Sequence, residues 1–71
     1  MTITDTDKRV LLCLARGMQS KEIAADLGRS KPTVESYIRS LFIKLDAQTR
    51  AQLVAIAIES GVISSAPGRP V

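Results

Sequence analysis

Apolar residues recur at helical spacing in four segments of the chain, each bounded by residues that start or stop helices. The first segment carries a stripe of three apolar residues, Val10, Leu11 and Leu14. Thr4 and Asp7 precede it with the spacing of a capping box, in which two side chains satisfy each other's backbone N–H groups. This pattern predicts a first helix over residues 4–16, which Gly17 is placed to end.

A second and a third helix are predicted on either side of a two-residue turn at 28–29. The second helix carries the apolar stripe Ile23, Ala24 and Leu27. Ser20 is placed to cap it, because Gln19 is a weaker capping residue. Ser30 is placed to cap the third helix, 30–45, with Pro32 in its first turn, where a missing N–H costs little. The predicted buried face of this helix consists of Val34, Ile38, Leu41, Phe42 and Leu45.

A fourth helix is predicted to begin near Thr49 and to end before Gly61. Its apolar positions are Leu53, Val54, Ala57 and Ile58. We expect one domain over residues 1–63 and a disordered tail over 64–71, since the tail has almost nothing to bury. The expected fold is therefore all-α, a four-helix domain in which the second and third helices form a helix-turn-helix.

The composition is consistent with one small domain of this kind. A chain of 71 residues with 45% apolar and 24% charged residues forms a single core, filled by aliphatic side chains because aromatic residues are scarce. Cys13 lies in an apolar run, which favours a buried structural thiol over a redox sensor. No histidine is present to complete a zinc site, so we expect neither metal nor cofactor. With no membrane-spanning run and no secretion signal, we expect a soluble, intracellular protein that does not bind membranes.

The net charge of +3 is confined to one segment, residues 29–50. This segment contains Arg29, Lys31, Arg39, Lys44 and Arg50 against Glu35 and Asp46. Such an excess is what a phosphate-binding surface needs, although solvated basic faces are also common. The outward face of the third helix begins at its N-terminus, where free N–H groups also favour phosphate. Both signals favour DNA binding, with the third helix in the major groove.

These residues together resemble the DNA-binding domain of LuxR-type bacterial transcription regulators, also called the GerE or FixJ/NarL type, over residues 3–63. The motifs that carry the resemblance are KEIAADL from Lys21, SKPTV from Ser30, KL at Lys44, Arg50 four residues after Asp46, and AIESGV from Ala57. The resemblance implies a third helix that reads the major groove, a second that braces it and a fourth that supplies a dimer contact. It also implies a location in the bacterial cytoplasm or nucleoid, and a salt bridge between Glu22 and Arg50.

The predicted DNA contacts are Lys21, Arg29, Lys31, Thr33, Val34, Glu35, Ser36, Tyr37, Arg39, Ser40 and Lys44. In the resemblance, Thr33 matches a phosphate-binding threonine, Val34 the apolar residue beside it, and Arg39 a position that is often basic. Glu35 repels phosphate but accepts a hydrogen bond from cytosine N4; as a compatible alternative, it pairs with Arg39 at i, i+4 on a solvated face. Tyr37 is expected either to bond a phosphate or to pack its ring on the second helix.

The fourth helix is apolar on more than one side, which a four-helix monomer does not need. The predicted dimer interface on it is Ala51, Gln52, Ala55, Ile56 and Glu59. The alternative is that these aliphatic residues are simply scattered on the surface, as in many proteins.

We therefore expect a sequence-specific transcription regulator that binds double-stranded DNA as a homodimer, on half-sites about one helical turn apart. The alternative is a protein-interaction module that pairs through the fourth helix with another LuxR-type regulator; RNA polymerase is a further candidate partner. An enzyme is not expected, because the sequence has no nucleophile beside a base and no phosphate-cradling glycine loop. No sensory or phosphoacceptor domain fits before Thr4, so both a stand-alone regulator and an excised domain are consistent with the sequence.

Overall fold

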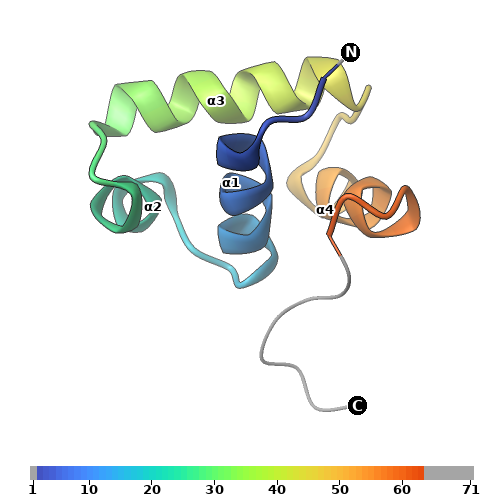
Figure 1. The fold of residues 1–71 in the computed structure, drawn as a ribbon, viewed down its shortest axis with the longest axis horizontal. Helices are drawn as coiled ribbons and strands as arrows, with labels where there is room; N and C mark the ends of the chain where they lie inside the picture. The colour runs from blue at the N-terminus through green and yellow to red at the C-terminus, as the bar shows by residue number, and fades with distance from the viewer. Residues whose placement is uncertain (1, 64–71) are drawn as a thin grey trace.

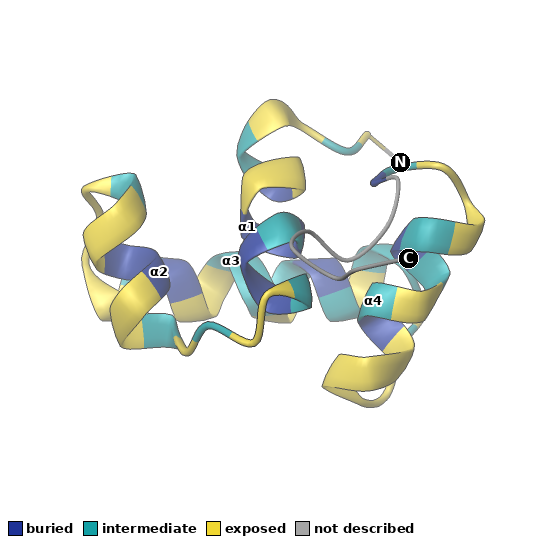
Figure 2. Ribbon diagram, turned by 90° about the horizontal axis from the view of Figure 1, so that it is seen from below, coloured by how far each residue is buried: buried dark blue, intermediate teal, exposed yellow. Residues whose placement is uncertain are grey.

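A computed structural model describes residues 2–63, which fold into four α-helices without a strand (Figure 1). The helices are α1 (Asp5–Ala15), α2 (Ser20–Leu27), α3 (Lys31–Lys44) and α4 (Arg50–Glu59). α1 lies between α2 and α4, and α3 runs across one side of all three (Figures 1 and 2). The predicted all-α, four-helix fold is thus confirmed. The tail predicted over 64–71 lies outside the described residues.

The helices α1 and α3 begin at the caps that the sequence predicts. Thr4 Oγ1 accepts a hydrogen bond from the Asp7 N–H at 3.1 Å, and Asp7 Oδ2 accepts one from the Thr4 N–H at 3.0 Å. This reciprocal capping box fixes the start of α1. Ser30 Oγ accepts from the Thr33 N–H at 3.3 Å, and the proline of α3 lies in its first turn. The N-terminus of α3 is therefore sharply defined.

Of the predicted caps of α2 and α4, the first is wrong and the second is confirmed. Ser20 is not the cap of α2: the helix begins at Ser20 itself and the cap is Gln19, so the sequence prediction is wrong by one residue. The reason is Glu22, whose Oε1 accepts a hydrogen bond from the Gln19 N–H at 2.8 Å. The predicted cap of α4 is confirmed, with Thr49 Oγ1 accepting from the Gln52 N–H at 3.1 Å.

The helices end at residues that adopt the left-handed backbone conformation. The predicted stops at Gly17 and Gly61 are confirmed. Gly28 has φ of +67°, a conformation that costs glycine little, and it begins the three-residue turn 28–30 that leads from α2 into α3. After α3, Asp46 takes the same role with φ of 53°, which aspartate tolerates better than most residues. The connection between α3 and α4 therefore lacks the glycine that marks the other helix ends.

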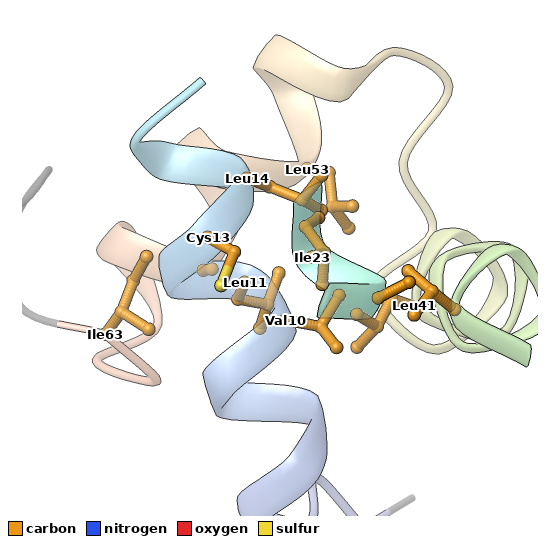
Figure 3. Packing of buried hydrophobic residues seen from close by; sticks show 11 residues of the cluster. Val10, Leu11, Cys13, Leu14, Ile23, Leu41, Leu53 and Ile63 are labelled. Carbon is orange, nitrogen blue, oxygen red and sulfur yellow. The ribbon is translucent and has the colours of Figure 1, made fainter. Parts of the chain in front are cut away.

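The core is aliphatic and draws on every described helix (Figure 3). Its buried apolar members are Val10, Leu11, Cys13, Leu14, Ile23, Ala24, Val34, Leu41, Leu53, Ala57 and Ile63. In Figure 2 the buried segments lie where the helices face one another. Cys13 is buried, as predicted. The pKa of its thiol is raised, mainly by burial and to a smaller extent by the nearby Asp26 carboxylate. Because α3 contributes only Val34 and Leu41 as fully buried residues, much of its surface stays available.

One ion pair lies at the edge of this core. Asp7 is 4% exposed, and its Oδ2 accepts a hydrogen bond from Lys44 Nζ at 2.8 Å. Burial raises the pKa of Asp7, but hydrogen bonds from Lys44 and Thr4 outweigh it and bring the pKa below its ordinary value. The pair joins the first turn of α1 to the last residue of α3 and so fixes the position of α3 on the core.

Candidate nucleic-acid interface

The face of α3 that turns away from the core is polar over most of its length. Exposed residues of this face are Lys31, Glu35, Ser36 and Arg39, and Thr33 and Ser40 are partly exposed. Arg29, which precedes the cap of α3, and Lys21, in the first turn of α2, are exposed as well. The predicted contacts of the helix-turn-helix are therefore accessible as a group, with the exceptions described next.

Three of the predicted contacts are not freely exposed. Val34 is fully buried at 0% exposure, so it packs in the core and is not available to a nucleic acid. The side chain of Lys44 is 22% exposed and is engaged by Asp7, which directs its charge into the protein. Tyr37 is half-buried and packs against the core, which favours the packing role over the phosphate-binding role of its ring. These residues position α3.

Glu35 and Arg39 lie four residues apart on the exposed face of α3 but do not form an ion pair with each other. The alternative in which Glu35 only pairs with Arg39 is therefore not what the structure shows. Both side chains are left with their hydrogen-bonding groups facing solvent. A free carboxylate accepts hydrogen bonds and a free guanidinium donates them, which are the two capacities that base edges in the major groove require.

A polar pocket of about 410 Å³ opens beside the start of α3. It is lined by Gln19, Ser20, Lys21, Lys31, Glu35 and Arg50. Ser20, Lys31 and Arg50 are the first residues of α2, α3 and α4, so the pocket takes side chains from three helices. Three cationic side chains against one carboxylate make the pocket suitable for an anion such as a backbone phosphate.

The salt bridge between Glu22 and Arg50 implied by the family resemblance is absent. Glu22 instead accepts the Gln19 N–H at the start of α2, and Arg50 Nη2 donates to the backbone carbonyl of Met18. Arg50 thus ties α4 to the turn between α1 and α2. Its guanidinium has five N–H donors, so this single bond leaves others for the pocket that it lines.

The outward face of α3 also carries an apolar residue that the sequence reasoning missed. Ile43 is 70% exposed and is the one large hydrophobic residue with an exposed side chain in the part of the chain that the structure describes. Ser36, Arg39, Ser40, Ile43 and Lys44 line a shallow groove of about 420 Å³. The signal was the run Leu41, Phe42 and Ile43, since a helix cannot bury three consecutive residues on one face.

The predicted dimer residues lie along α4. Ala51, Gln52, Ala55 and Glu59 are exposed, and Ile56 is half-buried. This surface of α4 is partly apolar and includes small residues, and none of the described residues covers it. Among residues 2–63, no three acidic, histidine or cysteine side chains gather as a metal site requires. None of the helices within this range is both long enough and apolar enough to cross a membrane.

Comparison with known proteins connects this geometry to a family. Residues 1–57 match the family described as bacterial regulatory proteins, luxR family. The chain is 40% identical over 62 residues to the transcriptional regulatory protein YdfI of Bacillus subtilis, covering 87% of this chain and 29% of that protein. It is 35% identical over 68 residues to the transcriptional regulatory protein FixJ of Azorhizobium caulinodans, covering 96% and 32%.

A solved structure has the same fold. The crystal structure of the phage VqmA–DPO complex superposes with a TM-score of 0.79 and 34% sequence identity, over 94% of this chain and 31% of that one. The chain thus spans less than a third of the length of each of these proteins and corresponds to one part of them.

Proposed function

This chain belongs to the luxR family of bacterial regulatory proteins, a family of transcription regulators and not of enzymes, and we propose that it binds double-stranded DNA sequence-specifically with α3 in the major groove. The observation that carries the proposal is the exposed polar face of α3, which starts at a capped N-terminus beside a cationic pocket. An α-helix fits the major groove, which is about 12 Å wide.

The two ends of this surface have different tasks in the proposed complex. Lys21 and Lys31 line the cationic pocket and contact backbone phosphates together with the exposed Arg29. Glu35 lies at the border of this pocket, and Ser36 and Arg39 lie beyond it along α3. In the proposed complex these three exposed side chains face the base edges. Phosphate contacts then orient the domain, and base contacts select the sequence.

Glu35 is the residue that distinguishes selection of a DNA sequence from electrostatic attraction to any DNA. A carboxylate inside a phosphate-binding surface lowers the affinity for every DNA sequence, and its benefit is a hydrogen bond from cytosine N4. Selection of bound sequences from random duplex DNA tests this, using the wild-type chain, Glu35→Ala and Arg39→Ala. Asp5→Ala, which removes an exposed acid from α1, outside both proposed interfaces, is the matched charge control.

We expect Glu35→Ala to relax the preference at one base pair by about 1 to 3 kcal/mol and to leave the other positions unchanged. Asp5→Ala leaves the selected sequence unchanged. A uniform gain in affinity for all sequences with Glu35→Ala would show that Glu35 is a repulsive charge only. If no sequence is enriched by the wild-type chain and binding does not weaken with salt, the DNA-binding proposal itself fails.

The proposal extends to a homodimer formed through α4. Its support is the surface of α4 formed by the exposed Ala51 and Ala55 and the half-buried Ile56. A two-fold pair of domains would bind half-sites about one helical turn apart. We expect Ala55→Glu to weaken binding to a duplex with two half-sites and to leave binding to one half-site unchanged, as measured by fluorescence anisotropy.

The same α4 surface also supports pairing with a different regulator. In that alternative, the chain acts through a partner and not through its own DNA contacts. Alanine substitutions at Lys31, Thr33 and Arg39 distinguish the two cases: they abolish the effect on a target promoter if the chain binds DNA, and they leave it unchanged if α4 pairing is the whole function.

A further inference from the structure

Ile43 stands apart from the other large apolar residues of the described chain because its side chain is 70% exposed. It lines the groove of about 420 Å³ on the outward face of α3, together with Ser36, Arg39 and Ser40. Burying such a side chain is favourable, so an exposed isoleucine on the proposed DNA-binding helix is available to bind a partner with apolar surface.

The position of Ile43 along α3 determines which part of a duplex it reaches. Ile43 follows Arg39 by four residues and Ser36 by seven, so the three share one helix face. At a rise of about 1.5 Å per residue, Ile43 lies about 6 Å beyond Arg39 and about 10 Å beyond Ser36 along the helix axis. With base pairs about 3.4 Å apart along the duplex axis, these distances span at most about two and about three base pairs for a helix inclined in the groove.

The major groove offers one prominent apolar group, the C5 methyl of thymine. We infer that Ile43 contacts a thymine methyl within about two base pairs of the position contacted by Arg39, and that it makes the domain prefer thymine there; this rests on the proposed function of α3. The occupant is DNA because the groove continues the exposed face of Arg39, whose charge complements phosphate.

The neighbouring residue supports this geometry. Lys44 is held by the buried Asp7 at 2.8 Å, so the last turn of α3 is fixed to the core and Ile43 projects from a rigid helix. Lys44 is not free to contact the DNA in place of Ile43. An apolar side chain itself gains nothing from phosphate, and in the major groove it discriminates through contact with a methyl group.

Replacing thymine by uracil tests the inference, because it removes the C5 methyl and changes nothing else in the base pair. The duplex is the one selected by the wild-type chain, and each thymine is replaced in turn. We expect one replacement, within about two base pairs of the position that Arg39→Ala relaxes, to weaken wild-type binding by about fourfold, the value of one buried methyl-sized group. Binding is measured by fluorescence anisotropy at fixed salt.

In Ile43→Ala, the same uracil replacement has no effect, whereas Ile43→Leu retains the sensitivity because it keeps an apolar side chain. Far-UV circular dichroism confirms that both variants fold, as expected for an exposed position.

The inference is overturned if Ile43→Ala keeps the uracil sensitivity, or if wild-type selection is sequence-specific yet no thymine methyl matters. A change in oligomeric mass with Ile43→Ala, with methyl sensitivity unchanged, assigns the groove to a second copy of the chain and also overturns it. An initial selection that enriches no sequence defeats the proposed function as well, so the two failures are distinguishable.

Discussion

The buried pair between Asp7 and Lys44 makes a quantitative prediction about stability. Two unit charges about 4 Å apart attract by about 4 kcal/mol at an effective dielectric constant near 20. Removing Asp7 from water, where it is 4% exposed, offsets part of this gain. We therefore expect a coupling energy of about 2 kcal/mol between the two side chains at neutral pH, within the usual range for residues in direct contact.

The coupling is measured with a double-mutant cycle of Asp7→Asn, Lys44→Met and the combined variant. Each free energy of unfolding comes from urea denaturation followed by far-UV circular dichroism. Lys44→Met is the most destabilised, because it leaves a buried carboxylate without its cation. The combined variant recovers part of the loss, since neither charge is then left unpaired.

The same pair predicts a pH dependence of known sign. The folded-state pKa of Asp7 lies below its ordinary value of 3.8. The stabilisation is therefore present above about pH 4 and is lost as the pH falls through the lowered pKa. The coupling energy should disappear in strong acid, and Asp7→Asn should lack this step in its stability profile.

The exposed pair between Arg9 and Asp26 is a matched control in the same chain. Its atoms are 3.8 Å apart, and its side chains are 61% and 49% exposed. A cycle with Arg9→Gln and Asp26→Asn should give a coupling energy below about 0.5 kcal/mol. If the Asp7–Lys44 coupling is equally small, or if it persists unchanged in acid, the role assigned to that pair is refuted.

Replacing Ser30 by alanine removes the hydrogen bond to the Thr33 N–H and should lower the free energy of unfolding by about 1 kcal/mol in urea denaturation; no change would contradict its capping role. Gly28→Ala should lower the free energy of unfolding by about 1 to 2 kcal/mol, because residue 28 has φ of +67°. The cost comes from the backbone alone, since an added Cβ meets nothing within 4 Å. Gly28→Asn should cost less, and equal thermal midpoints for the two variants would contradict a backbone origin. Cys13 should react with iodoacetamide at pH 8 much more slowly in the native chain than in urea, because burial and then Asp26 raise its thiol pKa. Equal alkylation rates, measured by mass spectrometry, would show that the thiol is accessible.

Features that depend on residues three or four positions apart could be predicted from the sequence. The capping box of Thr4 and Asp7 and the cap at Ser30 are of this kind, because their partners lie within the same helical turn. The same reasoning failed at Ser20. There Glu22 selects Gln19 as the cap, and a preference based on the capping residue alone ignores that partner.

Contacts between distant segments could not be predicted in this way. Helical periodicity places Lys44 on the outward face, yet its partner Asp7 lies 37 residues earlier and reaches it only after α1 and α3 pack. Arg50 likewise meets a backbone carbonyl, that of Met18, and not the acid that the resemblance implied. A backbone carbonyl gives no residue-type signal, so no sequence pattern marks it.

Tyr37 has a further practical consequence. The chain contains one tyrosine and no tryptophan, and this tyrosine is half-buried on α3, against the core. The tyrosine fluorescence of the protein therefore comes from α3, the helix that we propose binds DNA. Unfolding changes the surroundings of this ring, and so does a duplex bound along α3 in the proposed complex. Both events can be followed optically in the unlabelled protein.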